Sequence, residues 1–190
     1  MFSIARTKLL IGVRHHDAFK RIGDIETELR GGDLLFFRPS MDDPTVAYKG
    51  MRQLYLFARR SVREHLRSVW EGAWQLLGRP RPIPRGWDVD HVLPVCWAEA
   101  RGFEYVLVTP IPKTANRSAG AGLEKTAAQQ ENERLLARYI DVDVSGDYAY
   151  LTSASIAKLM GIATGPGNRG YPGLEKIKPD LEALQALLSY

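Results

Sequence analysis

Two short β-like stretches, residues 87–94 and 103–109, constrain the fold most, because they lead directly into a polar stretch at 112–118 that is typical of a helix start. Short runs of β-formers bounded by turn residues are the usual signal of strands. The segment therefore predicts two strands followed by a helix. An Asp-His pair ends the first predicted strand, and Asn116 lies near the predicted helix start, 25 residues after His91.

Composition excludes several classes of protein. The one cysteine, Cys96, excludes an internal disulfide and any zinc site built from several cysteines. No apolar run approaches the roughly 20 residues that span a bilayer, and the start of the chain lacks the pattern of a signal peptide. With 190 residues, 45% hydrophobic and 25% charged, we expect a soluble, cytoplasmic protein of one domain. Export by a dedicated secretion machine would leave no mark in the sequence and stays open.

Helical patterns dominate the rest of the chain. Apolar residues at spacings of three and four predict a long helix over 44–77, ended by Gly78. Further elements are predicted as helices at 17–29, 124–140, 152–160 and 175–188, and as strands at 34–37, stopping at Pro39, and at 148–151. We therefore expect an α+β, helix-dominated single domain. Its parts are a basic helical region at 1–86, the strand–strand–helix segment at 87–125, and a helical region at 126–190 that packs on the same domain.

Positive charge is concentrated in the first half of the chain. Residues 1–86 hold 16 Lys and Arg against 9 Asp and Glu, net +7, whereas residues 87–190 hold 10 against 13, net −3. A basic stretch suits a polyanion such as nucleic acid, but it equally suits a solvated helix face, and charge alone leaves both interpretations open. The candidates for nucleic-acid contact are Arg52, Arg59, Arg63, Arg79, Arg81, Arg85 and Lys113.

Aromatic and histidine residues outside the strand–strand–helix segment have plainer interpretations. Trp70 and Trp74 are expected to pack at the edge of the core rather than to stack on bases. His15 and His16 have no third potential metal ligand nearby in the sequence, so we expect them at the surface. His65 is expected to be solvated.

Residues 87–125 resemble the ββα-metal motif of HNH-family, metal-dependent nucleases. The string Asp88-Val89-Asp90-His91-Val92, with Pro94, is similar to the first part of that motif, and Lys113-Thr114-Ala115-Asn116-Arg117-Ser118 is similar to the last. Their separation suits the hairpin that lies between the two parts. A similar Asp-His and Asn-Arg arrangement occurs in the HNH domain of RNA-guided CRISPR effectors. The resemblance covers about 40 residues and none of the remaining chain.

The resemblance implies a role for four residues. His91 would accept a proton from the attacking water, which a histidine with an ordinary pKa of about 6.5 can do near neutral pH. Asp90 and Asn116 would give oxygen ligands to a hard divalent cation, Mg²⁺ or Mn²⁺, which stabilises charge on the phosphate. Arg117 would contact the phosphate.

Two departures from the family pattern change what the site needs. Members often carry an asparagine just after the second strand that orients the catalytic histidine, and residues 106–111 contain none. A backbone carbonyl or another side chain must therefore hold the ring of His91. The last motif position is Asn116 rather than a histidine, which favours Mg²⁺ or Mn²⁺ over zinc.

These observations predict a metal-dependent endonuclease that cleaves DNA with low sequence specificity. A phage or mobile-element nuclease fits a unit of this size, and so does an antibacterial toxin, which would need an acidic immunity protein as partner. One alternative is a catalytically decayed HNH-fold protein that only binds nucleic acid. Another is an RNase that uses the same site. No membrane association is expected, and the oligomeric state is open.

Overall fold

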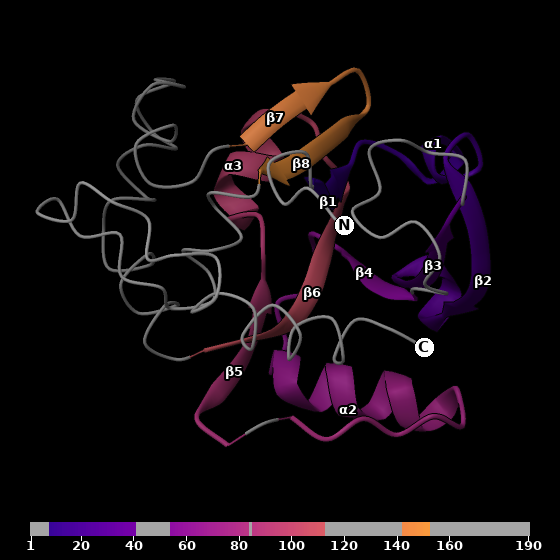
Figure 1. Cartoon of the computed structure of the whole chain (residues 1–190), viewed down its shortest axis with the longest axis vertical. Helices are drawn as coiled ribbons and strands as arrows, with labels where there is room; N and C mark the ends of the chain where they lie inside the picture. Colours follow the sequence, from indigo (N-terminus) through magenta and orange to yellow (C-terminus); the bar gives the residue numbers. More distant parts are fainter. Residues whose placement is uncertain (1–7, 41–53, 84, 113–141, 153–190) are drawn as a thin grey trace, which may run out of the picture.

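The computed structural model describes residues 8–40, 54–83, 85–112 and 142–152. These residues form one curled, antiparallel, half-barrel sheet of eight strands with three short α-helices (Figure 1). The expectation of a helix-dominated fold is wrong for the part of the chain described. The strands are β1 (Lys8–Val13), β2 (Gly23–Leu29), β3 (Leu34–Pro39), β4 (Tyr55–Arg59), β5 (Trp87–His91), β6 (Tyr105–Pro112), β7 (Val142–Ser145) and β8 (Tyr148–Thr152).

The order of strands across the sheet is β2-β3-β4-β6-β1-β8-β7, and β5 pairs with β6 away from this path. β6 pairs with three strands, β1, β4 and β5, because it is long. Its first residues, from Tyr105, pair with β4 on one side and β1 on the other. Its second half extends beyond them and pairs with β5 alone. The β5–β6 hairpin therefore projects from the sheet as a separate arm (Figure 1).

The helices are α1 (His16–Phe19), α2 (Leu66–Leu76) and α3 (Val95–Ala100), and a 3₁₀ turn, η2 (Arg30–Gly32), joins β2 to β3. α2 lies beneath β4 and β6, and α3 lies at the opposite end of the β5–β6 arm, between those two strands in the chain (Figure 1). Gly78 ends the α2 segment with a φ of +73°, a left-handed conformation that glycine adopts without strain.

The apolar residues divide between the two faces of the sheet. One core, here the first core, contains Phe19, Phe57, Trp97, Phe103 and Tyr105 among others. The second core lies between the sheet and α2 and is made of Leu34, Phe36, Leu54, Leu56, Ala58, Val62, Val69, Trp70, Ala73, Trp74 and Val108. Trp70 and Trp74 are 1% and 0% exposed, which confirms that they belong to the core.

Two predicted helices are wrong, for different physical reasons. The 17–29 segment holds a four-residue helix and then β2, whose residues alternate between half-buried and exposed, the period of two of a strand. In the 44–77 segment, the buried run Leu54–Ala58 leads into β4 (Tyr55–Arg59), a central strand covered on both faces, and the helix begins only at Leu66. A continuous apolar run fits both periodicities, and the chain resolves this by pairing β4 with β3 and β6.

Other predicted elements are confirmed. Strands are present at Leu34–Pro39, Trp87–His91, Tyr105–Pro112 and Tyr148–Thr152, and the first of these ends at Pro39 as expected. The predicted helices at 124–140, 152–160 and 175–188 lie almost wholly outside the described residues. None of the helices in the described ranges is long and apolar enough to cross a membrane.

Candidate nuclease site

The β5–β6 hairpin places Asp90 and His91 at the end of β5 that adjoins the turn into α3. In the antiparallel register Asp90 lies opposite Thr109, and His91 lies opposite Val108. Directly opposite residues in such a pair have side chains on the same face, whereas successive residues point to opposite faces. Asp90 and Thr109 therefore share one face of the hairpin, and His91 lies on the other with Val108.

The imidazole of His91 is held by the loop that follows β4. The ring forms a hydrogen bond to the backbone of Val62, and its Nε2 has no partner among the described residues and no exposed surface. Because Nε2 is free of that bond, Nδ1 is the nitrogen that donates to the Val62 carbonyl. This bond fixes the tautomer in which Nε2 carries the lone pair. The orienting group that the sequence lacks after the second strand is thus supplied by a backbone carbonyl.

Burial lowers the pKa of His91 below its ordinary value of 6.5. The nearby charge of Asp90 opposes this by favouring the imidazolium, whereas the charge of Arg63 lowers the pKa further, and the bond to Val62 raises it. Burial is the largest of these effects because an imidazolium loses its hydration there. His91 is therefore a neutral imidazole at neutral pH, with its basic nitrogen unpaired.

Two oxygen atoms on the Asp90 face lack partners. The carboxylate Oδ1 of Asp90 accepts a hydrogen bond from the backbone N–H of His91 at 2.8 Å, and no described residue donates to Oδ2. The hydroxyl of Thr109 is buried, with 1% of the residue exposed, and Oγ1 likewise has no partner among the described residues. A buried hydroxyl without a partner costs about 1–3 kcal/mol, so this atom calls for a functional explanation. Carboxylate and hydroxyl oxygens together fit a hard cation such as Mg²⁺.

Several predicted site residues lie outside the described part of the chain. Asn116, Arg117 and Lys113 follow the end of β6, and Arg52 precedes β4. Within the described ranges, no group of three or more His, Cys, Asp and Glu side chains is placed to hold a metal ion.

The remaining predicted arginines contact different parts of the molecule. Arg59 donates to the Tyr105 hydroxyl at 2.9 Å and forms an ion pair with Glu104 at 3.1 Å. The other ion pairs are Arg63 with Glu99 at 3.6 Å, near α3, and Arg79 with Glu26 at 3.4 Å, on β2. Arg81 is buried over the ring of Trp74, and Arg85 is exposed.

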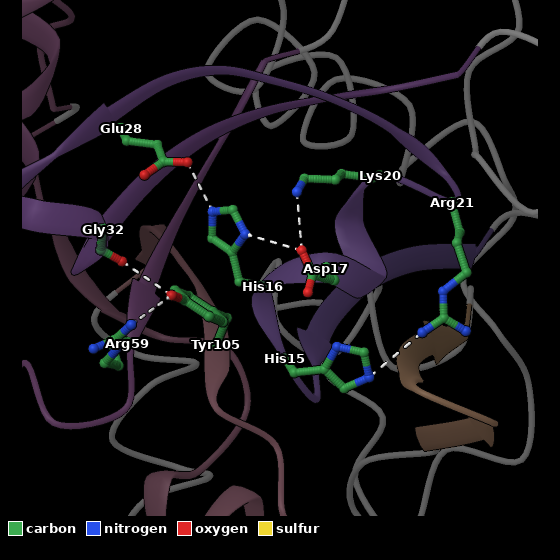
Figure 2. Close-up of polar contacts among 9 residues, drawn as sticks. All are labelled: His15, His16, Asp17, Lys20, Arg21, Glu28, Gly32, Arg59 and Tyr105. Atoms are coloured by element: carbon green, nitrogen blue, oxygen red, sulfur yellow. Dashed lines mark hydrogen bonds and ion pairs between the residues drawn. The ribbon is translucent and has the colours of Figure 1, made fainter.

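A second polar cluster, around His16, was missed as a site by sequence reasoning (Figure 2). His16 lies between two carboxylates, with Nε2 2.7 Å from Glu28 Oε1 and Nδ1 3.8 Å from Asp17 Oδ1. Beside it the buried Tyr105 hydroxyl donates to the Gly32 carbonyl and accepts from Arg59. Only the fold reveals this cluster, because its members come from α1, β2, η2, β4 and β6.

The polar groups of the His16 cluster pair with one another. Each ring nitrogen of His16 faces a carboxylate, and both hydrogen-bonding roles of the Tyr105 hydroxyl are used. Burial raises the pKa of Tyr105 above 10.0, although the bond from Arg59 opposes this, so the phenol stays protonated and is a poor nucleophile. The cluster therefore joins α1, β2 and β6 and leaves no reactive group free.

Comparison with protein-family models, with curated proteins and with solved structures gives no match.

Proposed function

We propose that this protein is a metal-dependent endonuclease that hydrolyses phosphodiester bonds in DNA, with His91 as general base. The observation that carries the proposal is the state of His91: a neutral ring, fixed through one nitrogen by Val62, whose Nε2 has no partner in the described part of the chain. A general base needs a free lone pair and a pKa at or below the working pH, and this ring has both. The oxygen face of Asp90 and Thr109 lies on the other side of the same strand pair.

Asp90 would hold the cation, with Asn116 as the second protein ligand that the resemblance to HNH nucleases implies. When bound, Mg²⁺ or Mn²⁺ would neutralise charge on the phosphate and on the leaving oxygen. The contribution of Asp90 requires that its carboxylate be correctly turned, and the bond from the His91 N–H to Oδ1 at 2.8 Å supports this orientation. Arg117 would contact the phosphate.

The proposal has one structural requirement. Nε2 of His91 is covered in this structure, so binding of the nucleic acid must displace what covers it before a water can reach the lone pair. A nuclease that closes only on its substrate meets this requirement, because catalytic hydrogen bonds often form only in the complex.

The same covered nitrogen favours a second candidate function, a protein that binds nucleic acid without cleaving it. In that case the ring of His91 would be a buried structural histidine, and the oxygen face of Asp90 would bind no cation. An RNase at the same site is distinguished from a DNase by substrate alone.

A plasmid-nicking assay separates these functions. Supercoiled DNA is incubated with the full chain in Mg²⁺ or in EDTA, beside the variants Asp90→Asn and Asp24→Asn. Asp24 is an exposed aspartate on β2 and serves as the matched control. We expect nicking that needs Mg²⁺, is lost in Asp90→Asn and is kept in Asp24→Asn. Binding without nicking would support the non-catalytic function, and cleavage of RNA alone would support the RNase.

We further propose the antibacterial-toxin setting as the one that the charge distribution supports. The first 86 residues carry a net charge of +7, a suitable target for an acidic immunity protein. Toxicity on expression that is relieved by a small acidic protein encoded beside it would support this setting, whereas harmless expression of a chain that nicks plasmid would favour a phage or mobile-element nuclease.

A further inference from the structure

The described arginines differ in how their charge is compensated. Most form ion pairs with carboxylates: Arg21 with Asp147, Arg30 with Glu64, Arg38 and Arg79 with Glu26, Arg59 with Glu104, Arg63 with Glu99, and Arg67 with Glu71. Arg14, Arg60, Arg85 and Arg101 have no carboxylate of the described residues within ion-pair distance. The charge of these guanidinium groups is therefore not compensated by an ion pair among the described residues.

Three of these arginines, Arg14, Arg60 and Arg101, gather at one short segment, residues 97–103, which spans the end of α3 and the turn that leads to β6. Arg60 donates to the Phe103 carbonyl at 3.0 Å. Arg14 donates to the Arg101 carbonyl and to the Gly146 carbonyl, the latter at 3.1 Å. Gly102, with a φ of +73°, lets the chain turn here close to the Arg14 guanidinium.

Two of these arginines lie over aromatic rings. The Trp97 and Phe103 rings stack with their centroids 5.8 Å apart and 19° between their planes. The guanidinium carbon of Arg101 lies 4.2 Å from the Trp97 centroid, and that of Arg14 lies 4.7 Å from the Phe103 centroid. Both rings are buried, so each cation lies over one ring of a buried, stacked pair.

Carbonyl and aromatic partners orient a guanidinium without neutralising it. A carbonyl has no formal charge, and each guanidinium has five N–H donors, of which these contacts use only one or two. Arg63 adds a fourth cation through Glu99, the single acidic residue of the 97–103 segment. The four arginines therefore share this segment with one acidic residue, Glu99, which pairs with Arg63 alone. Such an excess of positive charge suits a polyanion.

We propose that duplex DNA binds across this surface, defined by Arg14, Arg60, Arg63 and Arg101, through its phosphate backbone. The inference rests on the proposed function, because it names how the substrate reaches that site. The segment 97–103 begins within α3, the helix that follows β5 in the chain. Arg60 and Arg63 lie on either side of Val62 in the sequence, and the backbone of Val62 holds the His91 ring. A backbone lying across these arginines therefore passes beside His91.

The test measures binding in EDTA, where no metal-dependent cleavage occurs. Fluorescence anisotropy with a short labelled duplex gives the affinity at salt concentrations between about 50 and 200 mM. The test variant is Arg60→Gln/Arg101→Gln. The matched control is Arg30→Gln/Arg67→Gln, which removes two arginines that each form an ion pair with a carboxylate of their own, Glu64 and Glu71. A charge-keeping variant, Arg60→Lys/Arg101→Lys, separates loss of charge from loss of fold.

Each phosphate contact contributes roughly −0.9 to the slope of log affinity against log salt. We expect the test variant to lose about two such contacts, so that its deficit relative to wild type changes roughly tenfold across this salt range. The lysine variant and the control should keep the wild-type slope. An unchanged slope in the test variant, or an equal loss in the control, overturns the proposal, as does tighter binding of single-stranded RNA. Wild-type binding without nicking would refute the nuclease and leave this surface standing.

Discussion

His16 and His91 lie in two regions that use the same side chain in opposite ways. His16 is about one-third exposed and faces Glu28 and Asp17, one carboxylate for each ring nitrogen (Figure 2). His91 is mostly buried, donates through one nitrogen to a backbone carbonyl, and leaves the other unpaired. A polar cluster whose groups pair with one another stabilises the fold. A general base instead needs a nitrogen that the fold leaves without a hydrogen bond.

The largest effect is expected from exchanging the two histidines for alanine in turn. His91→Ala should lower the rate of Mg²⁺-dependent plasmid nicking by about 10²–10⁴-fold, the usual contribution of a general base. His16→Ala should keep the wild-type rate, because both of its nitrogens are committed to carboxylates. Initial nicking rates of the three proteins at equal concentration give the comparison, and binding of duplex in EDTA should be equal for all. Similar losses in both variants would remove the distinction between the two regions.

A smaller effect is expected from the two buried hydroxyls. Thr109→Val removes a hydroxyl without a partner beside Asp90, and it should lower nicking about 10–100-fold, as loss of a group that supports a metal ligand does. It should not lower the free energy of unfolding, because an unpaired buried hydroxyl is itself costly. Tyr105→Phe, in the His16 cluster, should do the reverse: it loses about 1 kcal/mol of stability and keeps its activity. Urea denaturation and nicking assays on both variants measure this; a destabilised, fully active Thr109→Val would show that the hydroxyl is merely structural.

The lowered pKa of His91 predicts a pH dependence of stability. The unfolded chain, with an ordinary histidine pKa of about 6.5, binds a proton in a pH range where the folded state does not. Stability therefore falls as the pH drops from about 6.5 toward the folded pKa, and it is fully present above that range. We expect the free energy of unfolding of wild type to fall more than that of His91→Gln when the pH is lowered. Urea denaturation of both proteins at neutral pH and near pH 5 checks this; a shift in favour of wild type would mean that the folded pKa of His91 is raised.

The smallest effect is expected at the His16–Glu28 pair. Its side chains are 32% and 47% exposed, so solvent screens the interaction. Glu28→Gln should cost less than about 1 kcal/mol of unfolding free energy and leave nicking unchanged. The measurement is again urea denaturation at neutral pH. A loss of nicking in this variant would make the His16 cluster, rather than His91, the centre of function.

The sequence predicts the functional hairpin better than it predicts the sheet around it. Asp90 and His91 lie at the end of a strand, as expected, because a short β-like stretch specifies its own local conformation. Residues 54–58 were predicted within a helix, since a continuous apolar run is compatible with either period and only pairing with β3 and β6 decides. The need for a group to orient His91 was visible in the sequence, but its identity, the Val62 carbonyl, depends on the fold.

The charge pattern of the sequence also predicts only part of the proposed DNA surface. The basic stretch between residues 52 and 85 contains Arg60 and Arg63 of the proposed DNA surface, but Arg14 and Arg101 come from distant parts of the chain. Linear charge density could not separate arginines that face carboxylates, such as Arg79, from those that face carbonyls or rings. Whether a carboxylate compensates the charge of an arginine depends on the folded structure.

Nitrogen-15 NMR of the His91 ring tests the whole account most directly, because every role given to this residue depends on one nitrogen being held and the other free. We predict a neutral ring protonated at Nδ1 at pH 7, with a pKa below 6.5 and a shift of the Nε2 signal when duplex DNA and Mg²⁺ are added. A ring protonated at Nε2, or one that titrates at or above 6.5, would contradict the assignment of His91 as the base.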